Sequence, residues 1–72
     1  MKKYKKRFVK EYKQLRKRTQ KLYKLTVKLD ADTLDFTPDS PLWVLKDQLT
    51  AMENYLHCLD LRAEYENIDL GD

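Results

Sequence analysis

The chain has little of the residue types that build many ligand and metal sites. Its 72 residues include one glycine, one cysteine and one histidine. One glycine, near the end of the chain, rules out a glycine-rich loop that cradles phosphates. One cysteine rules out an intrachain disulfide, and the sequence lacks the Cys and His partners at the spacing that a zinc site requires. We therefore expect no metal and no cofactor.

Long apolar runs are also missing. No stretch approaches the roughly 20 residues that cross a bilayer. A helix lying on a membrane surface would need a clean face of Leu, Phe or Trp. In the basic segment at the start of the chain, that face is needed for the core. We therefore expect no membrane partner.

Catalytic constellations are equally scarce. His57 stands next to Cys58, but adjacent helical side chains point about 100° apart and cannot act together as nucleophile and base. We expect Cys58 to be a small packed apolar residue. The aspartates between residues 30 and 39 depart from the EF-hand spacing. The sequence therefore predicts a protein that is not an enzyme.

The chain is too short to stabilise itself easily. A domain of this size buries about 60% of its unfolded surface, so it usually needs disulfides, a metal or partner subunits. Since the first two are not expected, we predict a homo-oligomer.

Residues 3–29 contain no Gly or Pro and follow a helical pattern. Apolar residues recur every seven positions, and a second set follows four positions later; the two sets are Phe8, Leu15, Leu22 and Leu29, and Tyr12, Thr19 and Thr26. This alternation predicts one helix of about 27 residues with a thin apolar stripe.

The segment 30–40 is rich in Asp and Pro and predicts a loop. Ser40 followed by Pro41 predicts an N-cap and a first helical residue. A second helix then runs over about 41–66, with a regular stripe of Leu42, Leu45, Leu49, Met52, Leu56, Leu59 and Ala63. We expect the residues after it to fray.

The predicted fold class is all-α: residues 1–72 form one helix–loop–helix hairpin that assembles into an oligomeric helical bundle. The apolar surface is wider than one facing helix can cover. The predicted oligomer core consists of Phe8, Leu15, Leu22, Leu45, Leu49, Met52, Leu56 and Leu59.

Charge is divided between the two halves of the chain. Residues 1–29 hold thirteen Lys or Arg and one acid, Glu11, whereas residues 30–72 hold two basic residues and eleven acids. Like charges four apart on a helix each cost about 0.2–0.5 kcal/mol at low salt. Something should offset this repulsion: either the acidic second helix, or a bound anion such as nucleic acid, a nucleotide or an anionic membrane surface.

Arginine and tyrosine in the first helix favour a nucleotide among these anions. Arg side chains bind phosphate through two parallel hydrogen bonds, and tyrosine rings can stack on bases. Tyrosines at helical spacing also commonly belong to a core. The predicted ligand-binding residues are Tyr4, Arg7, Lys10, Tyr12, Arg16 and Tyr23.

Two stretches, YKKRFVKEYKQLRKRTQKL and SPLWVLKDQLTAMENYLHCLDLR, resemble a family of small two-helix bacteriophage proteins. The second stretch carries the pattern WV-x-L-xx-QL-x-AM-xx-YL-xx-L-xx-R. Its positions here are Trp43, Val44, Leu45, Gln48, Leu49, Ala51, Met52, Tyr55, Leu56, Leu59 and Arg62. The resemblance spans roughly residues 4–66, although the first helix is more basic than we would expect for the family.

The resemblance implies a function. The family includes anti-CBASS proteins, which act as sponges: their helical subunits form an oligomer that holds a cyclic oligonucleotide at subunit interfaces without cleaving it. Tyr4 and Arg7 match what the resemblance leads us to expect at a nucleotide-contacting helix end. It also implies a phage protein that acts in the host cytoplasm during infection.

Two alternatives stay open. One is an anti-CRISPR-type inhibitor that binds a defence protein or its nucleic acid through the basic first helix. The other is a small helical oligomer in which the two charge blocks only fix an antiparallel pairing. Steep loss of binding with salt would distinguish a polyanion binder from the latter, whose assembly itself would weaken in salt.

Overall fold

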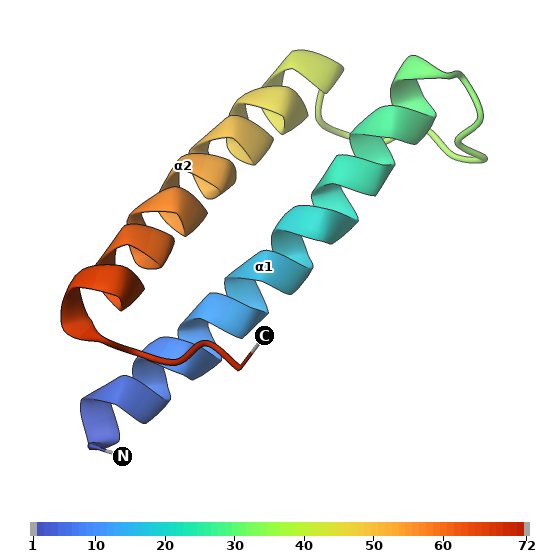
Figure 1. Cartoon of the computed structure of the whole chain (residues 1–72). Coiled ribbons are helices and arrows are strands. Elements are labelled where there is room, and N and C mark those ends of the chain that lie inside the picture. Colours follow the sequence, from blue (N-terminus) through green and yellow to red (C-terminus); the bar gives the residue numbers. More distant parts are fainter. Residues whose placement is uncertain (1, 72) are drawn as a thin grey trace.

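The computed structural model describes residues 2–71 and consists of two long helices packed side by side. Helix α1 spans Lys3–Asp30 and helix α2 spans Leu42–Glu66, and the two run antiparallel (Figure 1). The hairpin is elongated, with extents of 44 × 19 × 17 Å. The predicted all-α helix–loop–helix fold is confirmed, and no strand occurs within residues 2–71. Assembly into an oligomer stays a prediction.

Helix α1 ends where the backbone turns left-handed. Asp32 adopts a φ of 58°, which brings the Thr33 amide within 2.9 Å of the Lys28 carbonyl oxygen. This closing hydrogen bond satisfies a carbonyl that the end of a helix otherwise leaves unpaired. Asp tolerates a left-handed conformation better than most residues do. The Asp-rich segment therefore terminates the helix, as its composition predicts.

The start of α2 differs from the prediction by one residue. Pro41, expected as the first helical residue, is instead the N-cap, with an extended backbone (φ −67°, ψ 155°), and no side-chain cap is present. Its carbonyl accepts the amides of Val44 (3.1 Å) and Leu45 (3.3 Å). The expectation that Ser40 caps the helix is therefore wrong. Proline already holds the φ that a cap needs, and its carbonyl starts the helix.

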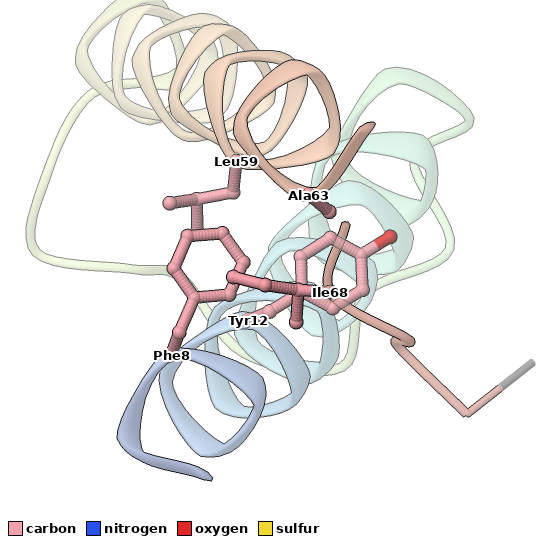
Figure 2. Packing of buried hydrophobic residues seen from close by; sticks show 5 residues of the cluster. All are labelled: Phe8, Tyr12, Leu59, Ala63 and Ile68. Atoms are coloured by element: carbon pink, nitrogen blue, oxygen red, sulfur yellow. The ribbon is translucent and has the colours of Figure 1, made fainter. Parts of the chain in front are cut away.

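The core is a small cluster near the open end of the hairpin. It is formed by five buried residues: Phe8, Tyr12, Leu59, Ala63 and Ile68 (Figure 2). Val9, Leu15, Leu56 and Leu70 pack against it and remain partly exposed. A core of this size gives a two-helix chain little stability.

Two threonines extend the interface along α1 toward the loop. Thr19 and Thr26 are buried, and their hydroxyls donate to the carbonyls of Leu15 and Tyr23, each at 2.7 Å. This back-bonding satisfies the hydroxyls inside the interface. Short side chains here bury little apolar area, so the interface is thin, as the sequence pattern indicates.

The predicted oligomer-core residues lie on both helices of a single chain. Phe8, Leu49 and Leu59 are buried, and the other five are partly exposed: Leu15, Leu22, Leu45, Met52 and Leu56. Several large apolar side chains outside this set are exposed: Tyr4, Tyr23, Val27, Phe36, Trp43, Tyr55, Leu61 and Tyr65. A single hairpin therefore leaves apolar surface to which a partner subunit could bind.

The residues after α2 fold back onto the core, so the expectation that they fray is wrong. Asn67 is the C-cap in a left-handed conformation (φ 56°), and the Ile68 amide donates to the Ala63 carbonyl at 2.8 Å. Asn favours this conformation more than most residues do. The turn directs Ile68 between the helices, where 7% of it remains exposed (Figure 2). The tail thus supplies a third wall of the core.

We predict that Ile68→Ala lowers the free energy of unfolding by roughly 2–5 kcal/mol, because it removes a buried side chain and leaves a cavity. Denaturant unfolding at a fixed protein concentration measures the change. Val27→Ala, at a position that is 46% exposed, is the matched control and should cost much less. Equal, small losses in both variants would show that the tail does not pack on the core.

Candidate functional site

The six predicted ligand-binding residues lie on different sides of α1. At about 100° per residue, Tyr4 and Arg7 fall on one flank, Arg16 and Tyr23 on the other, and Lys10 faces away from α2. The sixth, Tyr12, is in the core and only 6% exposed. One chain therefore does not bring the six together into one site, and the two Arg–Tyr pairs are the candidates.

Arg16 and Tyr23 line one shallow depression between the helices. Its volume is about 360 Å³, and its remaining lining comes from Thr19, Gln20, Glu53 and Leu56. The Tyr23 ring is 56% exposed, so it offers a surface on which a base can stack. An arginine, a glutamine amide and a carboxylate beside it can bind phosphate and the polar edge of a base. The depression thus has the groups that a nucleotide requires.

The opposite flank carries Tyr4, Arg7 and Glu11, spaced three and four residues apart. The Tyr4 side chain is 43% exposed. Across the interface, the Tyr55 hydroxyl donates a hydrogen bond to Oε1 of Glu11. This hydrogen bond, more than partial desolvation or the nearby negative charge, raises the pKa of Tyr55 above its ordinary value of 10.0. The single acid of α1 is therefore engaged by α2.

Arg62 of α2 reaches the same flank. Its Nε donates to Oε2 of Glu66 at 2.8 Å, and its guanidinium lies 4.8 Å from the centre of the Phe8 ring. The hydrogen bond to Glu66 raises the pKa of Arg62, which is already well above neutral. The ion pair and the ring hold a planar cation on the surface, where a phosphate could bind to its remaining N–H groups.

Sequence reasoning did not assign Tyr55 and Arg62 to a site, although both belong to the pattern that carries the family resemblance. They are seven residues apart and so lie on one side of α2. Glu11, as the single acid in the first 29 residues, was the available signal. An isolated acid in a basic helix indicates a specific partner, and the structure identifies that partner as Tyr55.

Two further hollows contain none of the predicted ligand residues. One, of about 550 Å³, lies at the start of α1 and is lined by Lys2, Lys5 and residues 67–69. The other, of about 460 Å³, lies beside the tail, and its lining includes Asp60, Glu64 and Asp69. Three carboxylates make the second hollow unsuitable for a phosphate.

Metal and thiol chemistry find little support on the described surface. Across residues 2–71, no three His, Cys, Asp or Glu side chains gather closely enough to hold a metal ion. Cys58, expected to be packed, is exposed and unpaired, because α2 turns it away from α1. Within the same range, neither helix combines the length and the apolar character needed to cross a bilayer.

A helical hairpin with cationic and aromatic groups on both flanks defines a small helical protein with a surface suited to binding. The sequence model of the Sequestin family matches residues 2–65, and the chain belongs to this family. This confirms the resemblance to small two-helix phage proteins that include anti-CBASS sponges. Searches of curated proteins and of solved structures gave no match.

We predict that Tyr55→Phe destabilises the hairpin at pH 8 and that the difference from the wild type shrinks as pH rises above 10. The pKa of Tyr55 is raised on folding, so its stabilising contribution is complete below pH 10 and is lost as the folded-state group ionises. Melting temperatures of both proteins between pH 8 and 11 measure the difference.

The control for this prediction is Tyr65→Phe, since Tyr65 is 88% exposed. That variant should follow the wild type at every pH. A Tyr55→Phe difference that stays constant across the range would contradict the assignment of the hydrogen bond.

Proposed function

We propose that the protein sequesters a cyclic oligonucleotide immune signal at interfaces between its subunits, without cleaving it. Membership of the Sequestin family over residues 2–65 is the observation that carries the proposal, because the family name denotes a sequestering role. Sequestration requires affinity and no turnover, so the protein would not be an enzyme. As a phage protein, it would act in the cytoplasm of the infected host.

The two flanks of α1 support a nucleotide as the ligand. Each flank presents an arginine and an exposed tyrosine: Arg16 with Tyr23, and Arg7 with Tyr4. Each such pair can bind one phosphate and stack on one base. A cyclic oligonucleotide repeats these two features around its ring, so two or more pairs would bind it better than one.

Oligomer symmetry would bring the pairs together. A single hairpin holds them on opposite sides of α1, where one small ligand cannot contact both. In a closed symmetric assembly, the same flank of neighbouring subunits would face a common ligand, and the near-symmetry of a cyclic oligonucleotide would match it. The exposed Trp43, Leu61 and Tyr65 provide apolar area for such contacts.

We predict that one cyclic di- or trinucleotide raises the melting temperature by roughly 10 to 20 °C at a concentration near 100 times its Kd, whereas linear RNA and DNA of similar composition raise it far less. Thermal unfolding against a panel of cyclic nucleotides tests this, with size-exclusion chromatography in parallel. The absence of any shift would oppose the sponge and favour the anti-CRISPR-type inhibitor, to be sought by pull-down from a host lysate.

Arginine variants test where the ligand binds. We expect Arg7→Ala and Arg16→Ala each to weaken cyclic-nucleotide binding by about 10- to 100-fold, because each removes charge-assisted hydrogen bonds to phosphate. Arg18→Ala removes the same charge two residues from Arg16 and serves as the matched control in calorimetric titrations. If Arg18→Ala weakened binding as much as the other two, net charge rather than position would explain the affinity.

A further inference from the structure

The lysines of α1 form a row that the proposed function does not use. Eight of them recur at spacings of three and four residues along the helix. They are Lys3, Lys6, Lys10, Lys13, Lys17, Lys21, Lys24 and Lys28. At about 1.5 Å per residue the row is roughly 38 Å long. We call these eight residues the lysine row.

The lysine row faces directly away from the core. At about 100° per residue, the eight lysines occupy a sector of α1 about 80° wide, opposite Phe8, Tyr12, Thr19 and Thr26. No other residue of α1 falls in that sector. Helix α2 lies along the other side of α1 (Figure 1), so all eight lysines are exposed.

No acid within the described chain neutralises this surface. Within residues 2–71, none of the eight lysines takes part in an ion pair, and Lys46 and Arg62 hold the salt bridges at 3.0 and 2.8 Å. The row includes like charges four residues apart, such as Lys13 and Lys17, which repel each other. A bound polyanion would remove this repulsion, so binding and folding would support each other.

A second copy of the chain does not supply the missing anions. The face of α2 that points away from α1 carries Trp43, Asp47, Asn54, Leu61 and Tyr65. Asp47 is the single acid in that sector of the helix. One carboxylate cannot balance eight ammonium groups, so packing this face of α2 against the lysine row would bury unpaired charge.

The cyclic ligand is also too small for the row. It carries one phosphate per nucleotide, whereas the eight lysines extend over roughly 38 Å. The partner that matches the row is a long, straight polyanion. A nucleic acid duplex is such a partner, and 38 Å corresponds to about 11 base pairs at 3.4 Å per pair.

The residue types in the row distinguish among polyanions. Single strands are held on aromatic platforms, and membranes favour helices with an apolar face, yet the row contains neither aromatic nor apolar residues. The arginines of α1, which could read bases or make forked contacts, lie on the flanks: Arg7, Arg16 and Arg18. Lysine binds phosphate as a mobile point charge and reads no sequence.

We propose that the lysine row of α1 is a second binding surface, distinct from the Arg–Tyr flanks, that binds the phosphate backbone of double-stranded nucleic acid without sequence preference. Each lysine that contacts a phosphate releases a counterion, so the affinity falls steeply with salt. The surface stands independently of the cyclic-nucleotide proposal, because it shares none of the residues that line the depression beside Tyr23.

Fluorescence anisotropy with a labelled 24-base-pair DNA duplex, at several salt concentrations, tests the proposal. The logarithm of the binding constant should fall with the logarithm of salt concentration with a slope of about −7 if all eight lysines contact phosphate. Substituting Lys17, Lys21 and Lys24 by Gln should reduce the slope to about −4.5 and weaken binding at least tenfold at 50 mM salt. Gln is a good helix former, so the variant keeps its fold.

The matched control substitutes Lys2, Lys5 and Arg18 by Gln, which removes the same charge outside the row. It should change the slope by less than one. Equal weakening in the two triple variants would overturn the proposal, since net charge would then suffice. So would a wild-type protein that does not bind the duplex at 50 mM salt, or one that binds vesicles of phosphatidylserine and phosphatidylcholine in its place.

Discussion

The packing of Phe8 and Tyr12 beneath Leu59, Ala63 and Ile68 is the contact on which the hairpin depends. Two helices share only one interface, and here much of that interface is filled by threonines and partly exposed leucines. The five-residue cluster therefore bears an unusual share of the apolar burial. The tail is part of this solution, because Ile68 closes a side of the cluster that neither helix can cover.

This economy of burial decides where function can lie. Since α1 uses one narrow face for the core, about three quarters of its circumference meets solvent or a partner. The chain distributes its basic residues over that circumference by type. Arginines lie on the flanks beside α2, and lysines occupy the back. The tyrosines follow the same division: Tyr12 supports the fold, whereas Tyr4 and Tyr23 remain exposed beside arginines.

The sequence pattern was sufficient for the helices, because a 4-3 apolar alternation without Gly or Pro permits few other structures. It was insufficient at the ends. Pro41 took the cap position in place of Ser40 because its own carbonyl starts the helix, and Ile68 was missed because one residue after a helix has no periodicity to reveal it. Tyr12 was assigned to the ligand because residue type alone does not separate a core tyrosine from a stacking one.

The contacts between the helices show the same limit. Heptad spacing places Glu11 on a flank of the first helix and Tyr55 on a flank of the second, but the relative rotation of the helices decides whether the two flanks meet. In the structure they do, and Tyr55 donates to Glu11. This hydrogen bond fixes the rotation of α2, and with it the position of Arg62 over Phe8. A site that is divided between two helices is therefore invisible until that rotation is known.

The separation of arginine from lysine has a consequence for binding. A guanidinium makes directional, forked hydrogen bonds that favour one ligand geometry, whereas an ammonium group on a flexible stem accepts many. The flanks can thus select a compact nucleotide while the back of the same helix attracts an extended polyanion. The two surfaces also differ in their response to salt, because a long row of phosphate contacts releases many counterions and a compact pocket releases few. Ionic strength alone can therefore shift the protein from one partner to the other.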